Sequence, residues 1–139
     1  MKRLPPFLFA AALAVVLLTG CDRLMSVEQR LDRAQSAFDA GHDSAAMADV
    51  KTVLEREPAN AAGRILLARL TLRLGDATTA RKELERAVQA GVDASTASEL
   101  DQSILLAQGR FADALAAAQK EAGDQSTRRQ LVIVEALMG

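Results

Sequence analysis

The chain has 139 residues, of which 17 are basic and 18 are acidic, so its formal net charge is −1. It contains no Trp, no Tyr and only four Phe. Nucleic-acid-binding proteins rely on a basic surface and on aromatic rings that stack on bases, and this composition supplies neither. The composition therefore excludes a nucleic-acid-binding protein.

Residues 1–20 have the pattern of a secretion signal. Lys2 and Arg3 precede an uncharged apolar run over residues 7–18, which is short for a membrane-spanning helix. The run ends in the sequence LTGC at residues 18–21. This resembles the lipobox of bacterial lipoproteins, in which an aliphatic residue and two small residues precede the acylated cysteine. We therefore predict cleavage after Gly20, lipidation of Cys21 and a short linker over residues 21–26.

The lipoprotein resemblance implies a location for the mature protein. Cys21 is the only cysteine, so no internal disulfide can form. A diacylglycerol on its sulfur and an N-linked acyl chain such as palmitate anchor a protein stably, since each buried methylene contributes about 0.8 kcal/mol. We expect a lipid-anchored protein that faces the periplasm without spanning the membrane. Asp22 resembles a retention signal that favours the inner over the outer membrane.

The remainder of the chain has a period of 34 residues. Gly41, Gly75 and Gly109 are separated by this distance, and an alanine follows each glycine after five positions. Glycine commonly ends helices because it adopts the left-handed conformation without steric strain. A 34-residue unit of two helices is typical of tetratricopeptide repeats. The sequence therefore predicts an all-α solenoid of tetratricopeptide helical hairpins.

We place three repeats at 27–60, 61–94 and 95–124, and the first helix of an incomplete fourth repeat at 125–139. The last helix lacks the polar face of a capping helix, so we expect a longer array or a partner that covers it. Apolar residues surround most of the helix expected at 64–74, as if it were packed on both sides. Asp76, and Asp43 or Ser44, are expected to cap the second helices of their hairpins.

The first helix of each hairpin lines the concave face of such an array, where partners bind. This face is predicted to contain residues from three repeats: Leu31, Gln35 and Phe38; Ile65, Arg69, Leu72 and Arg73; and Glu99, Ser103 and Leu106. Arginines among leucines suit a peptide or helix with an acidic group, since they form charge-assisted hydrogen bonds with carboxylates. The alternative is that Arg69 and Arg73 pair with nearby acids of the chain itself.

No group of residues suggests catalysis, so we predict a protein that is not an enzyme. His42 is the only histidine and is expected in an exposed loop, and a metal site needs further ligands. Glu83 and Glu85 are expected on a solvated helix face beside Arg86, without converging as acid–base pairs do. We therefore expect no catalytic residue, no metal, no cofactor and no small-molecule substrate.

Three segments resemble one particular family. The sequences VLEREPAN at 53–60, LRLGD at 72–76 and KEL at 82–84 are similar to the first repeats of tetratricopeptide lipoproteins that accompany exosortase and PEP-CTERM sorting. Where that family often has Trp, this chain has Arg30, Arg64 and Ser98. The resemblance implies a scaffold in exopolysaccharide biosynthesis and export that binds other proteins of the cell envelope. Alternatives are a pilotin or outer-membrane assembly lipoprotein, and an enzyme with a hydrolase domain beyond Gly139.

Overall fold

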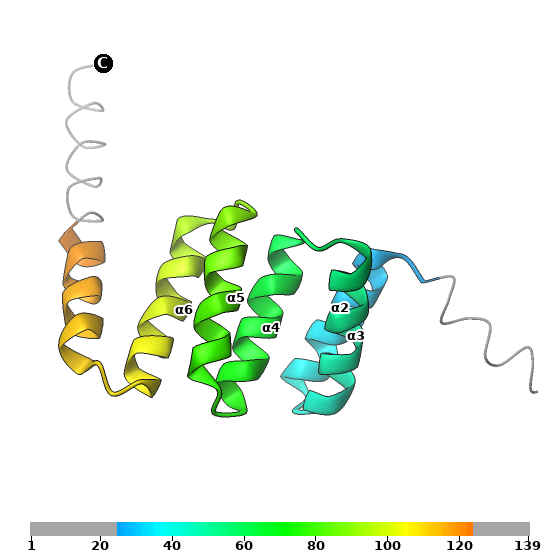
Figure 1. Ribbon diagram of the computed structural model, residues 1–139, viewed down its shortest axis with the longest axis horizontal. Coiled ribbons are helices and arrows are strands. Elements are labelled where there is room, and N and C mark those ends of the chain that lie inside the picture. The colour runs from blue at the N-terminus through cyan, green and yellow to red at the C-terminus, as the bar shows by residue number, and fades with distance from the viewer. Residues whose placement is uncertain (1–24, 124–139) are drawn as a thin grey trace, which may run out of the picture.

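The computed structural model describes residues 25–123, and these residues form helices joined by short turns (Figure 1). The helices are α2 (Val27–Asp39), α3 (Asp43–Arg56), α4 (Ala61–Arg73), α5 (Ala77–Gln89), α6 (Ala94–Ala107) and a further helix over residues 111–123. The predicted all-α class is thus confirmed. The signal peptide, Cys21 and the helix expected at 125–139 lie outside the described residues.

Consecutive helices pack as antiparallel hairpins. Helix α2 packs against α3, and α4 against α5, while α4 also contacts α2, α3 and α6. The hairpins follow one another along a single direction, with the turns between paired helices on one edge of the molecule (Figure 1). This succession is the predicted helical-hairpin solenoid. Helix α6 begins at Ala94, one residue before the expected start of the third repeat.

The periodic glycines close the first helix of each hairpin. Gly41, Gly75 and Gly109 have φ angles of +76°, +86° and +72°, which L side chains rarely adopt. At Gly75, the N–H of the next residue, Asp76, donates to the carbonyl of Thr71 at 2.8 Å, and the other two turns repeat this bond. Such a bond satisfies a carbonyl that the helix end leaves free.

Side-chain caps begin most of these helices. Asn60 accepts a hydrogen bond from the N–H of Gly63 at 2.8 Å. Asp76 accepts one from the N–H of Thr79 at 2.9 Å, as the sequence predicted for Asp76. The expected cap by Asp43 or Ser44 is wrong. Helix α3 begins at Asp43, and the preceding His42 makes no side-chain cap bond. The carboxylate of Asp43 pairs with a distant arginine instead, as described below.

Two apolar clusters form the core, and α4 contributes to both. One cluster joins the first hairpin to α4 and contains Ala34, Ala46, Val50, Leu54, Leu66 and Leu70. The other joins α4, α5 and α6 and contains Ile65, Ala68, Ala80, Leu84, Ala87, Leu100 and Ile104. Because α4 lies between the clusters, its apolar residues cover most of its circumference, as the sequence indicated.

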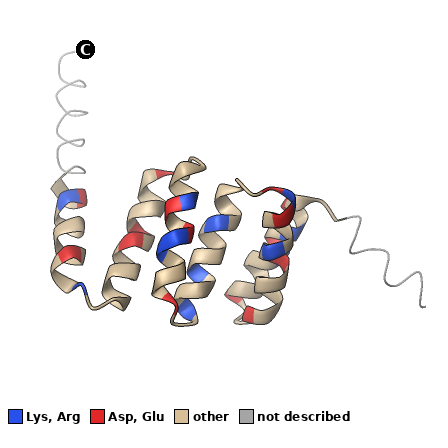
Figure 2. Cartoon of the chain, viewed as in Figure 1, with Lys and Arg blue, Asp and Glu red and all other residues tan. Residues whose placement is uncertain are grey.

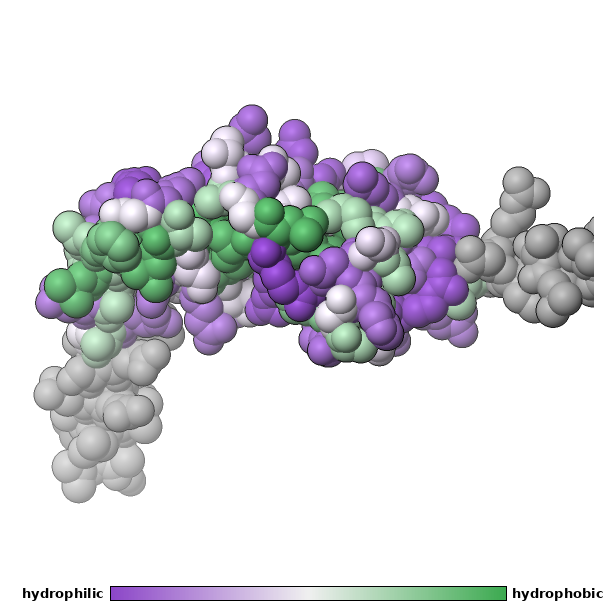
Figure 3. All heavy atoms as spheres, turned by 90° about the horizontal axis from the view of Figure 1, so that it is seen from below, coloured by the Kyte–Doolittle hydropathy of each residue, from purple (hydrophilic) through white to green (hydrophobic). Residues whose placement is uncertain are grey.

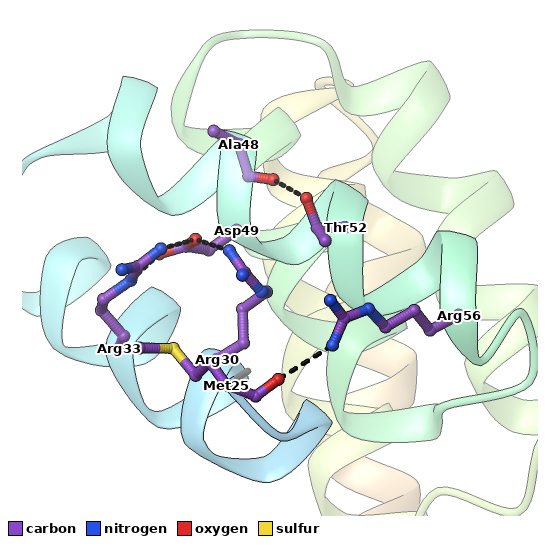
Figure 4. A network of polar contacts seen from close by, with 7 residues as sticks. All are labelled: Met25, Arg30, Arg33, Ala48, Asp49, Thr52 and Arg56. Carbon is purple, nitrogen blue, oxygen red and sulfur yellow. Dashed lines mark hydrogen bonds and ion pairs between the residues drawn. The ribbon is translucent and has the colours of Figure 1, made fainter. Parts of the chain in front are cut away.

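Arg30 and Arg64, which stand at two of the positions where tryptophan was noted as missing, each form a buried ion pair. Arg30 donates to Asp49 at 3.0 Å, and Arg64 donates to Glu83 at 2.7 Å. Each pair joins the two helices of one hairpin, and the second pair lies 34 residues after the first. Figure 4 shows Arg30 and Arg33 both directed at the carboxylate of Asp49. The expectation that Glu83 lies on a solvated face is wrong, since only 5% of it is exposed.

The arginines act on the ionisation of Asp49. Hydrogen bonding by Arg33, at 2.6 Å from Nε to Oδ2, is the largest of the effects that lower the pKa of Asp49. The charges of Arg33 and Arg30 lower this pKa further, while burial opposes them. The carboxylate is therefore held ionised between two guanidinium groups, as a buried charge requires.

The third hairpin packs differently from the first two. Ser98 replaces the arginine, and its hydroxyl donates to Glu121 at 3.1 Å. Within residues 111–123, Ala114 is buried, whereas Phe111 and Leu115 are 67% and 60% exposed. Figure 3 shows hydrophobic surface at this end of the molecule. Helix 111–123 therefore buries little apolar surface among the described residues.

Candidate functional site

A hollow lies between the first helices of the three hairpins. Its volume is about 320 Å³, and α2, α4 and α6 all contribute side chains. The lining residues are Phe38, Arg69, Leu72, Arg73, Glu99, Leu100 and Ser103. We call this hollow the groove. All of them except Leu100 are residues that the sequence assigned to the concave face.

Other residues assigned to this face lie elsewhere. Ile65 is only 6% exposed and belongs to the core cluster around α5, so its assignment to the groove is wrong. Leu31 packs against the core of the first hairpin, and the amide of Gln35 donates to Asp39 at 2.8 Å. Leu106 is 52% exposed but does not line the groove. The 34-residue period predicts where the helices lie, but it does not determine the direction in which each side chain points.

Arg73 is held in place by the first hairpin. Its guanidinium carbon lies 3.6 Å from the ring centroid of Phe38, and two of its nitrogens each donate to the carbonyl of Phe38 at 3.0 Å. Its charge also forms an ion pair with Asp43. This arginine therefore follows the alternative in which it pairs within the chain. Its contacts join the end of α4 to the first turn of the array.

Arg69 differs from Arg73 although both line the groove. Its side chain is half-buried, and within residues 25–123 it has no hydrogen-bond or ion-pair partner. Glu99 lines the same hollow from α6, and its carboxylate likewise has no hydrogen-bond or ion-pair partner among the described residues. The two side chains do not approach within the 4.0 Å of an ion pair. The groove thus presents one positive and one negative charge that the side chains of residues 25–123 do not neutralise.

Comparison with known proteins agrees with this architecture. A model of the tetratricopeptide repeat matches residues 28–100, more than half of the chain. The chain belongs to the tetratricopeptide repeat family. Proteins of this family typically act as non-catalytic scaffolds that bind other proteins, so the groove is a candidate protein-binding surface. No curated protein and no solved structure matches the chain.

Most arginines of the tetratricopeptide array have carboxylate partners, unlike Arg69. Arg64 and Arg86 share Glu83, and Arg81 pairs with Asp101 across the junction of α5 and α6. Figure 2 shows acidic and basic residues interspersed along the helices, so no large surface of one sign forms in this view. A protein that binds this array would therefore interact with individual charged side chains and not with a large surface of one charge.

A second hollow lies between α5 and α6, and the sequence did not indicate it. Its volume is about 640 Å³, and apolar residues such as Leu84, Val88 and Val92 line it. Val88 is 54% exposed, whereas Leu54, which lies 34 residues earlier, is only 9% exposed. The junction between the second and third tetratricopeptide repeats is therefore more open than the junction before it.

The described part of the chain contains no grouping of metal-ligand side chains. No three His, Cys, Asp or Glu residues lie together among residues 25–123 as a metal ion would require. His42 is exposed beside the first turn. Between residues 25 and 123, every helix is too short or too polar to cross a bilayer.

Proposed function

We propose that this protein is a lipid-anchored periplasmic scaffold whose tetratricopeptide groove binds a segment of another envelope protein. The assembly that it serves is the machinery for exopolysaccharide biosynthesis and export linked to PEP-CTERM and exosortase sorting. The groove supports binding because Arg69 has no hydrogen-bond or ion-pair partner within residues 25–123 and lines the same hollow as Phe38 and Leu72. The lipobox at Cys21 supports anchoring, and the three segments that resemble exosortase-associated lipoproteins support the pathway.

The proposed mechanism is local concentration at the membrane. Acyl chains at Cys21 hold the chain in the bilayer, and α2 begins at Val27. Residues 22–26 span at most about 18 Å when fully extended, at about 3.3–3.6 Å per residue. The array is thereby kept near the bilayer surface, which raises the effective concentration of the groove for membrane-bound partners.

Site-specific crosslinking tests the binding part of this proposal. A photoreactive amino acid at Leu72 places the reactive group in the groove, and the same amino acid at Glu55 places it on the exposed side of α3. After irradiation of cells, we expect a component of the polysaccharide machinery to be crosslinked at Leu72 and not at Glu55. Capture of a secretin or a barrel protein would instead favour the pilotin or outer-membrane assembly alternative.

Replacement of Cys21 tests the anchoring part. We expect Cys21→Ser to abolish incorporation of a labelled palmitate and to move the protein out of the membrane fraction. Wild-type protein in the same cells should carry the label. Membrane association of Cys21→Ser at the wild-type level would contradict the lipid anchor and leave the groove assignment unaffected.

A further inference from the structure

The two charges of the groove that have no partner among the described residues lie on different helices. Arg69 projects from α4 and Glu99 from α6, and apolar Leu72 and Leu100 line the same hollow. Arg69 is partly exposed and Glu99 is exposed, so both charged groups are accessible to water while no segment is bound. A bound segment displaces part of this water, and a charge that loses water without gaining a partner is strongly unfavourable.

Arg73, in contrast, does not require an oppositely charged group from a partner. Its guanidinium already contacts the ring and carbonyl of Phe38 and the carboxylate of Asp43. Covering it therefore leaves no unsatisfied charge. Its contacts hold the Phe38 ring at the edge of the groove, so Arg73 is a positioning residue.

The size of the groove limits what enters it. A volume of about 320 Å³ is at the lower end of pockets that bind small ligands, which span roughly 300–1,000 Å³. Such a hollow suits one large apolar side chain on Phe38, Leu72 and Leu100. The charged groups then contact the residues that flank this side chain.

We infer that the groove selects a peptide segment in which an acidic and a basic side chain flank one large apolar side chain. Arg69 binds the acidic side chain, and Glu99 binds the basic one. This inference rests on the proposed function, since it assigns the chemistry of the segment that the groove receives. Charge complementarity of this kind determines specificity because the wrong order of charges places like charges together.

Peptide binding with exchanged charges tests the inference. The full lipidated chain in detergent micelles is used to select binders from a displayed library of random 12-residue peptides. The enriched peptide and a version with its acid and base exchanged are then synthesised. We expect the exchanged peptide to bind wild-type protein at least tenfold more weakly in fluorescence anisotropy.

Protein variants test which residues of the groove bind the charged side chains of the peptide. We expect Arg69→Glu and Glu99→Arg each to weaken binding of the original peptide, and the double variant to prefer the exchanged peptide. Arg73→Ala should weaken both peptides alike, since it acts through Phe38. Lys82→Glu and Glu55→Arg are matched controls because both residues are exposed outside the groove. Circular dichroism verifies that each variant is folded.

Two outcomes would overturn the inference. One is equal binding of both peptides to the wild type; the other is a selection that enriches no peptide with this pattern. Either result would leave the proposed function standing if crosslinking at Leu72 still captures an envelope protein. Absence of a crosslink at Leu72 would instead contradict the proposed function itself.

Discussion

At the scale of single residues, an ion pair takes the place of a large side chain between the helices of each of the first two hairpins. Arg30 and Asp49 are 5% and 6% exposed, so the cost of removing both charges from water is offset only while both are present. The same arrangement recurs at Arg64 and Glu83. The buried acids Asp49 and Glu83 therefore each join the two helices of one hairpin.

We expect Asp49→Asn to destabilise the protein by about 3 kcal/mol, because Arg30 would remain buried without its anion. The free energy of unfolding, measured in urea, checks this value. Asp32→Asn is the control, since Asp32 is exposed on α2, the helix that carries Arg30, and should change stability by less than about 0.5 kcal/mol. Equal effects of the two substitutions would contradict a stabilising role for the buried pair.

The contribution of Asp49 should also depend on pH. Its folded-state pKa lies below the unfolded value near 3.9, because Arg33 and Arg30 favour the carboxylate. The stabilisation is therefore full above about pH 4 and is lost as pH falls through the folded-state pKa. We expect the difference in unfolding free energy between wild type and Asp49→Asn to shrink between pH 4 and pH 3. A constant difference over this range would contradict the assignment.

At the scale of elements, α4 depends on close contact with the preceding helix. Gly63 is buried in its first turn, and a Cβ there would lie 3.1 Å from Cδ2 of Leu54 and 3.2 Å from Cγ1 of Val53. Both of these side chains are core residues with little exposed surface. The small residue thus sets how closely α3 and α4 approach each other.

Gly63→Ala separates helix propensity from packing. Propensity alone predicts a gain of about 1 kcal/mol, since alanine favours helices over glycine. We expect a net loss of about 1 kcal/mol instead, because the added methyl overpacks the contact with Leu54 and Val53. Thermal unfolding measures the change in stability. The control is Ala62→Gly, because Ala62 is exposed and its substitution changes only the helix propensity. A higher melting temperature for Gly63→Ala would contradict this account.

At the scale of the whole molecule, packing becomes sparser towards the end of the array. The first two hairpins share buried clusters through α4, whereas within residues 111–123 the side chain of Ala114 is the buried one. The stability of a repeat protein is close to a sum of units and of the interfaces between neighbours. A unit with a weak interface therefore opens more readily than the rest.

Hydrogen exchange should reveal this gradient. We expect backbone amides of residues 111–123 to exchange at least tenfold faster than those of α4 and α5, because fewer apolar contacts oppose their opening. Mass spectrometry of the full chain in micelles, followed by peptic digestion, measures both regions in one sample. Uniform protection from α2 through residue 123 would show that the last described helix is as firmly packed as the others.

Features that depend on local chemistry could be predicted from the amino-acid sequence. The glycines at 41, 75 and 109 end helices because their left-handed conformation is intrinsic to glycine. Asp76 caps α5 because a side-chain oxygen at that position can reach a free N–H. Alanines at fixed offsets, such as Ala46 and Ala80, indicated where helices cross, and both are fully buried. These signals act within a few residues or repeat with the period, so they can be read from the chain.

Which charges are neutralised depends on tertiary packing and could not be predicted from the sequence. Arg69 and Arg73 are alike in sequence, yet Arg73 has contacts with Phe38 and Asp43 that lie 35 and 30 residues away. Glu83 resembles its exposed neighbour Glu85, but the rotation of α5 places it against Arg64. Such outcomes depend on how each helix is turned about its axis and on how closely the hairpins approach. Packing of the whole array determines both, and no local pattern records them.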